Sequence, residues 1–380
     1  ERRVKVMEDE HGTLEETDSV RLVAFVNSGS GAKNGPKFMV FMERFLGKEF
    51  VFDLKEDKGA EKGLKYHNEM REEREEMRVL ACGGDGTFSW VAGCISKMGL
   101  ERVVLLPVAL GSGNDMARAL GWGHKYPGTA RFAKMLEYIE RSPTTNLDIW
   151  EYSVNCEKQK EASSPDPRRF FCNYISMGID AKVELQFNEA RWENPDKFNS
   201  RVGNIVWHAV YGARLSIWDR KIHRIGDYVD QIFVDGQKLD LPSNVQALLI
   251  MNIPSYAAGA SPWGRPDKRS TWGESLVDDC KLEVMALINL NHFVRVKAAG
   301  GHAIRLAQGS RVSLKLKDGV DHVPVQADGE PWRQECGKDF EVKLARQLPT
   351  VKGPRHRLKT RNHAKFTASA SVPAELSLAK

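Results

Sequence analysis

The sequence lacks the features that mark several classes of protein. Its longest uninterrupted apolar run, Val103 to Leu110, is eight residues long and includes a proline, whereas a transmembrane helix needs about twenty apolar residues. The six cysteines stand singly, with no C-x-x-C pair, so neither a zinc finger nor a disulfide framework is indicated. This usage of cysteine favours a reducing compartment, and we expect a cytoplasmic protein.

Two common signatures of phosphate transfer are also missing. The chain contains no Walker A pattern GxxxxGK[ST], and neither the HRD nor the DFG motif of protein kinases. Any phosphate site in this chain must therefore use other residues.

The length and composition are those of an ordinary globular protein. Charged residues make up 28% of the 380 residues and apolar residues 41%, and a chain of this length favours two domains. The chain begins with Glu1 rather than Met, which predicts that it is a fragment.

Residues 19–146 alternate short apolar runs with helical patterns, after an N-terminal extension at 1–18. The predicted strands are Leu22 to Val26, Phe50 to Leu54, Val79 to Cys82 and Val103 to Pro107, and the predicted helices are Pro36 to Leu46, Glu61 to Arg78 and Phe88 to Met98. This alternation predicts a three-layer, Rossmann-like α/β domain with a parallel sheet covered on both faces. Ligands of such sheets bind beyond the carboxyl ends of the strands.

Strands dominate residues 147–348. We predict strands at Phe170 to Ile175, Gln231 to Val234, Val245 to Met251, Lys281 to Ile288, Val312 to Lys317, Val323 to Gln326 and Phe340 to Leu344, and helices at Gly203 to Trp218 and Asn291 to Leu306. Asp-Gly pairs begin at positions 235, 318 and 328, where hairpins can turn. We expect a mainly antiparallel, sandwich-like second domain, with the active cleft between the two domains.

Three glycine-bearing turns follow predicted strands of the first domain. They are Asn27-Ser28-Gly29-Ser30-Gly31, Gly83-Gly84-Asp85-Gly86-Thr87 and Gly111-Ser112-Gly113-Asn114-Asp115. Glycine lets backbone N–H groups approach a ligand closely, and a helix that begins just beyond adds the positive end of its dipole, so such turns suit phosphate. A single GGDGT turn is also explained by tight chain reversal, but a second turn on the neighbouring strand favours one shared phosphate site.

At these residues the chain resembles a known family. The runs LACGGDGTFSWV and PVALGSGNDMARALGWG closely resemble the catalytic domain of eukaryotic-type diacylglycerol kinases. The blocks NYISMGIDAKVELQF, NIPSYAAGASPWG, DDCKLEVMAL and QADGEPWRQ resemble the accessory domain of that family, and the resemblance extends from about Arg21 to Ala345. Ser112 stands where the family usually has threonine, and the hydroxyl group is kept.

The resemblance implies a lipid kinase that transfers the γ-phosphoryl group of ATP, with Mg²⁺, to the primary hydroxyl of 1,2-diacylglycerol and forms phosphatidic acid. Such transfer depends on positioning and charge neutralisation. The expected nucleotide-binding residues are Asn27, Ser30, Gly83, Gly84, Gly86, Thr87, Gly111, Ser112, Gly113, Asn114 and Asp115.

Four carboxylates are candidates for the chemistry. Asp85 is the first choice as a catalytic or Mg²⁺-linked carboxylate, and Asp115 is the second, although Asp115 also suits a helix cap. Across the cleft, either Asp328 or Glu330 of QADGEPW is expected to act as general base on the lipid hydroxyl. The alternatives for these two are a turn-forming aspartate and a surface charge.

Other functions remain open at this point. Sphingosine and ceramide kinases, NAD kinases and phosphofructokinases share the GGDG turn, but the GSGND, GIDA and ADGEPW blocks favour the diacylglycerol branch. A catalytically silent lipid-binding scaffold is a different class, and the four retained carboxylates argue against it.

Residues 349–380 form a basic tail. From Lys352 to Lys365 there are six lysines and arginines and no acidic residue. The simplest interpretation is a solvated, disordered tail, and the alternative is attraction to an anionic membrane surface. We expect peripheral membrane association with diacylglycerol as substrate, and no nucleic-acid partner.

Overall fold

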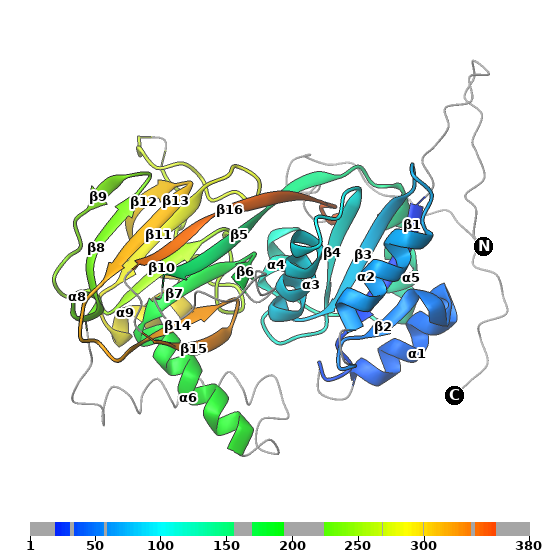
Figure 1. Cartoon of the computed structure of the whole chain (residues 1–380), viewed down its shortest axis with the longest axis horizontal. Helices are drawn as coiled ribbons and strands as arrows, with labels where there is room; N and C mark the ends of the chain where they lie inside the picture. The colour runs from blue at the N-terminus through cyan, green and yellow to red at the C-terminus, as the bar shows by residue number, and fades with distance from the viewer. Residues whose placement is uncertain are drawn as a thin grey trace.

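The computed structural model describes residues 20–30, 34–56, 59–155, 169–193, 224–267, 269–298, 300–335 and 339–354. The described chain forms an α/β part and a β-rich part, which lie side by side in Figure 1. The predicted helix at Gly203 to Trp218, the N-terminal extension, Gly31 and the tail beyond Pro354 lie outside the described residues.

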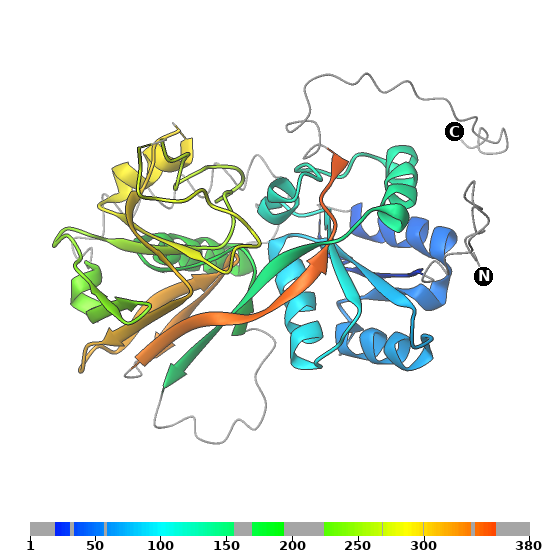
Figure 2. The same cartoon turned by 90° about the horizontal axis from the view of Figure 1, so that it is seen from above.

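The first part is built on a parallel sheet with strand order β2-β1-β3-β4. Its strands are β1 (Val20–Val26), β2 (Val51–Asp53), β3 (Glu76–Gly83) and β4 (Val103–Ala109). Its helices are α1 (Asn34–Leu46), α2 (Gly59–Met70), α3 (Asp85–Lys97), α4 (Asp115–Ala119) and α5 (Thr129–Arg141). Helices lie on both sides of the sheet (Figure 2), so the predicted layered α/β architecture is confirmed.

Two boundaries in this part differ from the sequence prediction. The helix expected from Glu61 to Arg78 ends at Met70, and Arg78 lies in β3. The reason is tertiary, because the Arg78 guanidinium is buried and donates to the carbonyls of Ile139 and Ser142 at the end of α5. Phe50, expected in a strand, ends a short 3-10 turn that precedes β2.

The second part consists of two six-stranded sheets. One has the order β12-β11-β10-β7-β14-β15 and the other β6-β5-β16-β13-β8-β9. The strands are β5 (Thr145–Asn155), β6 (Phe170–Phe171), β7 (Tyr174–Gly178), β8 (Val229–Val234), β9 (Gln237–Leu239), β10 (Ala247–Met251), β11 (Leu282–Leu287), β12 (Ile304–Gly309), β13 (Arg311–Leu316), β14 (His322–Ala327), β15 (Glu330–Glu335) and β16 (Asp339–Thr350).

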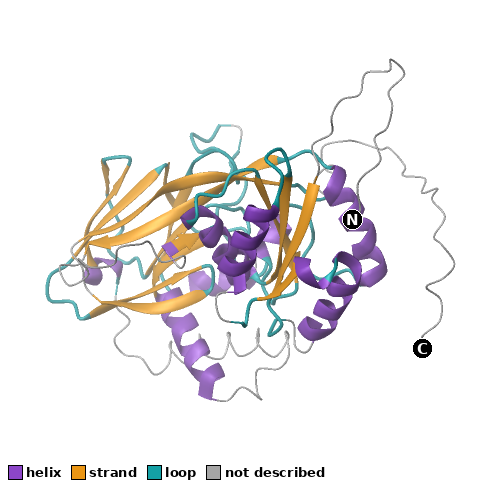
Figure 3. Ribbon diagram, turned by 45° about the vertical axis from the view of Figure 1, so that its right-hand side comes forward, coloured by secondary structure: helices purple, strands orange, loops and turns teal. Residues whose placement is uncertain are grey.

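The pairings in both sheets are antiparallel, as predicted. Alternate residues of β13 are buried, and Val312 and Leu314 join a core that the two sheets share. Helices α6 (Ile179–Glu193), α8 (Ile225–Tyr228) and α9 (Leu290–Ala298) accompany these sheets. Figure 3 shows how strands predominate here and helices in the first part.

Three sequence expectations for this part are wrong in detail. The run Phe170 to Ile175 is divided between β6 and β7, which belong to different sheets. The helix expected to reach Leu306 ends at Ala298; Gly300 then adopts a left-handed φ of 66°, and Ile304 begins β12. The Asp318-Gly319 pair does not close a hairpin, because β13 and β14 lie in different sheets.

The long strands β5 and β16 connect the two parts. They pair along almost their whole length and run from one part into the other in Figure 2. At the far end of β16, Thr350 Oγ1 donates to the Leu105 carbonyl (2.6 Å), and Leu348 and Val351 join the core of the first part. None of the described helices is long and apolar enough to cross a bilayer.

Candidate active site

The second and third glycine turns contact each other at the carboxyl ends of β3 and β4. The Gly83 carbonyl accepts from the N–H groups of Leu110 (2.9 Å) and Gly111 (3.1 Å). A Cβ atom added to Gly111 would lie only 2.4 Å from the Gly84 Cα, so no side chain fits between the turns. The structure therefore brings together two sets of residues that the sequence analysis assigned to one phosphate site.

The first turn meets the second through side chains. Asn27 Nδ2 donates to the buried Thr87 Oγ1 (3.2 Å), and Asn27 Oδ1 accepts from the Gly29 N–H (3.0 Å). The Ser30 N–H donates to the Asn27 carbonyl (2.9 Å). All three turns thus lie together at the beginning of α3. The N-cap residue of this helix is Gly84, Asp85 is its first residue, and no side chain caps it.

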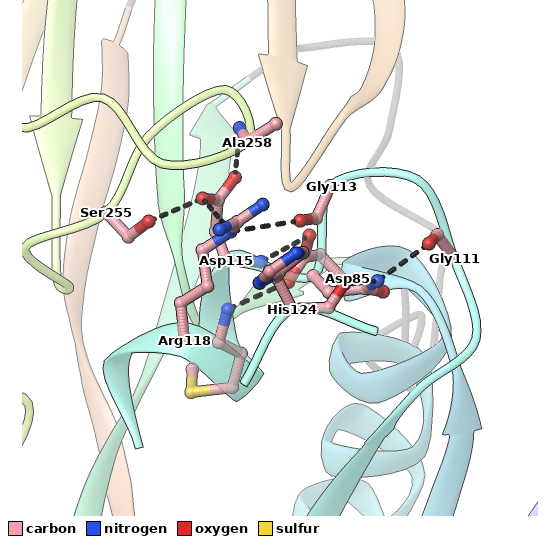
Figure 4. A network of polar contacts seen from close by, with 10 residues as sticks. Asp85, Gly111, Gly113, Asp115, Arg118, His124, Ser255 and Ala258 are labelled. Atoms are coloured by element: carbon pink, nitrogen blue, oxygen red, sulfur yellow. Dashed lines mark hydrogen bonds and ion pairs between the residues drawn. The ribbon is translucent and has the colours of Figure 1, made fainter. Parts of the chain in front are cut away.

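The Asp85 carboxylate links the second turn to the third. Its Oδ2 accepts from the Asp115 N–H (3.0 Å) and its Oδ1 from the Met116 N–H (2.9 Å), so it caps the N-terminus of α4 (Figure 4). A Cβ atom on Gly113 would lie 2.9 Å from Asp85 Oδ2. Each carboxylate oxygen has a second lone pair, so this capping leaves Asp85 able to bind a cation.

Asn114 has a left-handed backbone and a buried side chain. Its φ is 55°, and its Nδ2 donates to the carbonyls of Gly111 (2.6 Å) and His124 (2.9 Å). Its Oδ1 is buried and has no hydrogen-bond partner among the described residues. Ser112, by contrast, is exposed at the outer edge of the turn.

The Asp115 side chain turns away from its own helix and toward the second part of the chain. Its carboxylate, which is 1% exposed, accepts from the Ser255 hydroxyl and from the Ala258 N–H (2.8 Å). Burial raises the pKa of Asp115 to about 6, and the charge of Asp85 adds to this; both hydrogen bonds and Arg118 oppose the rise. Sequence reasoning missed Ser255 and Ala258, because nothing local to them indicates a distant partner.

Asp328 lies at a tight turn between β14 and β15. Its buried carboxylate accepts from the backbone N–H groups of Cys172 (2.8 Å), Asn173 (2.9 Å) and Tyr174 (2.9 Å), and also from the Ser89 hydroxyl of α3. Burial raises the pKa of Asp328 to about 6, and these donors oppose the rise. Four donors on one carboxylate fix the hairpin against both β7 and α3.

Glu330, the first residue of β15, reaches the second glycine turn. A Cβ atom on Gly86 would lie 3.1 Å from Glu330 Oε1, so the carboxylate lies directly against the first turn of α3. The Glu330 side chain is exposed and accepts no hydrogen bond from the described residues. Partial desolvation raises the pKa of Glu330, and the charge of Arg191 opposes this shift.

The accessory domain also contains a buried polar cluster that the sequence analysis did not identify. Asp180, the aspartate of the GIDA block, is 2% exposed. Its Oδ2 accepts from Ser176 (2.6 Å), Tyr256 (2.9 Å) and Gln326 (2.8 Å), which joins β7, β14 and the loop after β10. The aspartate of a recognised sequence block was the available signal, but its three partners are distant in sequence.

The described residues contain no group of three His, Cys, Asp or Glu side chains that converge on a metal position. Mg²⁺ does not need such a group, because it is usually held by one or two carboxylates together with substrate phosphates. The Asp85 carboxylate and the unpartnered Asn114 Oδ1 are hard oxygen donors of the kind it prefers, and both lie at the paired glycine turns. The residues present therefore fit a magnesium–nucleotide complex.

Two regions of the chain match models of known protein families. Residues 21–151 match the diacylglycerol kinase catalytic domain, and residues 170–331 match the diacylglycerol kinase accessory domain. This chain belongs to the diacylglycerol kinase family. The paired glycine turns lie in the catalytic domain, and Ser255, Asp328 and Glu330 lie in the accessory domain.

Curated relatives agree with the two domain matches. The chain is 34% identical to diacylglycerol kinase 1 of Arabidopsis thaliana over 348 residues, which are 88% of this chain and 46% of that protein. It is 33% identical to human diacylglycerol kinase zeta over 353 residues, 88% of this chain and 36% of that protein. The chain thus spans about half, or less, of the length of these two relatives.

A solved structure supports the fold. A protein from Bacillus anthracis str. Sterne, assigned provisionally as a diacylglycerol kinase, superposes with a TM-score of 0.54 over 90% of this chain and 99% of its own. The two sequences are 17% identical, so this likeness concerns the fold alone.

Proposed function

We propose that this chain is an ATP-dependent diacylglycerol kinase, which phosphorylates the primary hydroxyl of 1,2-diacylglycerol and forms phosphatidic acid. The observation that carries the proposal is the position of Glu330. This accessory-domain carboxylate lies against Gly86, at the start of α3 and beside the two touching glycine turns. A carboxylate so placed has a phosphate-binding surface on one side and the second domain on the other.

The glycine turns and the N-terminus of α3 would receive the phosphates of ATP. Backbone N–H groups and the helix dipole stabilise negative charge there, and glycine keeps the surface free of side chains. Asn27, Ser30 and Thr87 border this surface on one side, and Ser112, Asn114 and Asp115 border it on the other. The family supports ATP as phosphate donor.

Asp85 and Asn114 Oδ1 would hold Mg²⁺ in the loaded enzyme. Bound Mg²⁺ would neutralise charge on the phosphates and so favour transfer. Asp85 also keeps α4 in place through its two accepted N–H bonds, so the side chain that orients the third turn would also supply an oxygen ligand to Mg²⁺.

Glu330 is the better candidate for the general base of the two accessory-domain carboxylates. A general base needs an accessible oxygen with a lone pair directed at the hydroxyl that it deprotonates. Asp328 is buried and already accepts four hydrogen bonds, whereas Glu330 accepts none from the described residues. We therefore assign proton removal to Glu330, and assign to Asp328 the task of holding the hairpin that carries it.

We also propose that residues 19–146 form the catalytic domain and residues 147–348 the accessory domain. The substrate is a bilayer lipid, so we propose a cytoplasmic enzyme that associates peripherally with anionic membranes. The basic tail that would assist this binding lies mostly outside the described residues.

Phosphate transfer from labelled ATP to lipid in mixed micelles tests the proposal. Diacylglycerol, sphingosine and ceramide are offered separately with Mg²⁺, and we expect phosphorylation of diacylglycerol only. Glu330→Gln should lower kcat by about 100-fold or more, the usual contribution of a positioned general base. The control is Glu189→Gln, which removes a carboxylate paired with Arg333 on the exposed face of α6.

Comparable rates on sphingosine or ceramide would overturn the substrate assignment. Near-normal turnover of Glu330→Gln would remove Glu330 from the mechanism. Absence of transfer to all three lipids, with the fold intact, would favour a lipid-binding scaffold.

A further inference from the structure

We propose that the accessory-domain loop from Ser255 to Gly259 is a positioning element for the kinase reaction. The loop donates hydrogen bonds to Asp115 and thereby holds the third glycine turn against Asp85. Ser255 is the positioning residue of this loop. The inference rests on the proposed function, since it concerns the geometry of the same nucleotide site.

The loop makes two hydrogen bonds to one buried carboxylate. The Ser255 hydroxyl donates to Asp115 Oδ1, and the Ala258 N–H donates to Oδ2, so each oxygen has its own donor from the loop. In Figure 4 dashed lines join the Asp115 carboxylate to Ser255 and to Ala258, and Gly113 and Asp85 are drawn beside it. Because Asp115 is almost fully buried, water does not compete effectively for these bonds.

The hydrogen bonding continues from Asp115 to other residues of the catalytic domain. The Asp115 N–H donates to Asp85 Oδ2, so an unbroken series of hydrogen bonds connects Ser255 to Asp85. A second connection passes through Arg118, whose Nε lies 3.4 Å from the Gly113 carbonyl. A Cβ atom on Gly259 would lie 3.4 Å from Arg118 Nη1, so the loop also covers this guanidinium.

The backbone of the loop is strained where it makes these contacts. Ala257, Ala258 and Gly259 have successive φ values of 49°, 72° and 117°, and two of these three residues carry a Cβ that disfavours left-handed φ. Such strain persists only where the surroundings over-determine the conformation, and it concentrates at functional sites.

Hydrogen bonds at the two ends of the loop hold this strained backbone in place. Tyr256 and Ala260 exchange two backbone hydrogen bonds (2.9 and 2.8 Å), which close the loop. The Tyr256 hydroxyl also donates to the buried Asp180 (2.9 Å). The loop is therefore anchored in the accessory domain, while Ser255 and Ala258 contact Asp115 of the catalytic domain.

This arrangement predicts a specific kinetic effect. If Ser255 only stabilised the fold, its loss would lower stability and leave the kinetics of the folded enzyme unchanged. If it positions the third turn, its loss loosens the phosphate site, which raises KM for ATP and lowers kcat. KM for diacylglycerol should stay within about twofold, because we assign the glycine turns to the nucleotide and not to the lipid.

The test compares Ser255→Ala with Ser255→Thr in the full chain. A hydrogen bond to a charged group contributes enough that its loss should lower kcat/KM for ATP by about tenfold or more. Ser255→Thr keeps the hydroxyl and should recover most of the activity. The matched control is Ser275→Ala, which removes a serine hydroxyl that donates to the buried Glu283 (2.7 Å) and should leave both kinetic constants for ATP unchanged.

Unchanged kcat and KM for ATP in Ser255→Ala would overturn the inference, as would failure of Ser255→Thr to exceed Ser255→Ala. Calorimetric binding of a non-hydrolysable ATP analogue separates this result from failure of the proposed function. A wild-type chain that binds the analogue and phosphorylates no diacylglycerol would overturn the substrate assignment, while weaker analogue binding by Ser255→Ala would still support the positioning role.

Discussion

The Asp235-Gly236 turn, between β8 and β9, and the Asp328-Gly329 turn, between β14 and β15, have the same backbone geometry. Their φ values are 48° and 79° in the first turn and 50° and 87° in the second, as in the left-handed turns that favour Asp-Gly in hairpins. Both aspartates also accept backbone N–H groups from a neighbouring turn. The donors to Asp235 are Ser310 and Arg311, and those to Asp328 are the residues from Cys172 to Tyr174.

The two turns differ in what surrounds the carboxylate. Asp235 is exposed; of its partners, Arg311 begins β13 of the same sheet and Ser310 directly precedes that strand. Asp328 is 6% exposed, and the Ser89 hydroxyl reaches it from α3 of the catalytic domain. The same local motif therefore closes a surface hairpin in one place and joins two domains beside the candidate active site in the other. Burial of the carboxylate, and not the turn itself, decides how much the motif contributes to stability.

The largest expected difference in the free energy of unfolding is between the variants Asp328→Asn and Asp235→Asn. An amide replaces one acceptor oxygen by a donor, so at Asp328 at least one buried N–H or hydroxyl loses its partner, at a cost of about 3 kcal/mol in the free energy of unfolding. At Asp235 water can replace the lost partner, and the cost should stay below about 1 kcal/mol. Urea denaturation measures both values, and equal losses would show that burial does not separate the two turns.

A smaller difference in the free energy of unfolding is expected between the variants Ser89→Ala and Ser310→Ala. Each change removes a hydroxyl that donates to the aspartate of its turn. Ser89 is buried, so its loss should cost about 1.5 kcal/mol of unfolding free energy, whereas Ser310 is exposed and its loss should cost less than about 0.5 kcal/mol. Ser89→Ala should also lower kinase activity, because it releases α3 from the hairpin that carries Glu330. Normal activity in that variant would contradict the coupling.

The smallest stability difference, close to zero, is expected between Gly329→Ala and Gly236→Ala. A Cβ atom at either position meets no atom within 4 Å, so the cost arises only from the left-handed backbone, about 1 kcal/mol in each case. Activity should nevertheless fall only in Gly329→Ala, since Glu330 follows that turn directly. Thermal unfolding and the ATP transfer assay, run on both variants, test this separation of stability from activity.

The position of the glycine turns was predictable from the sequence because each follows a buried strand directly. The apolar runs Val79 to Cys82 and Val103 to Pro107 indicate neighbouring parallel strands, and such strands end at one edge of a sheet. The contact between Gly84 and Gly111 follows from that arrangement. The fold class was predictable for the same reason, since the periodicity of apolar residues is a local property of the chain.

The tertiary contacts of the accessory-domain residues were not predictable in this way. Ser89 and Asp328 are 239 residues apart, and Ser255 and Asp115 are 140 residues apart. No local pattern marks either pair, because a serine hydroxyl acquires a partner only when another part of the chain is folded beside it. The Asp318-Gly319 pair was misjudged for the same reason. The local sequence suggested a hairpin, but the strands on either side of the pair belong to different sheets.

The sequence by itself determined the alternation of elements, the glycine turns and the family to which the chain belongs, since these depend on residues close together along the chain. Tertiary structure decided which carboxylate accepts several hydrogen bonds and which accepts none from the described residues. Asp328 and Glu330 are two residues apart at one hairpin, yet the Asp328 carboxylate accepts four hydrogen bonds, whereas the Glu330 carboxylate lies against Gly86 and accepts none from the described residues. The physical reason is that burial and hydrogen bonding of a side chain depend on the segments folded around it, which its neighbours in sequence do not specify.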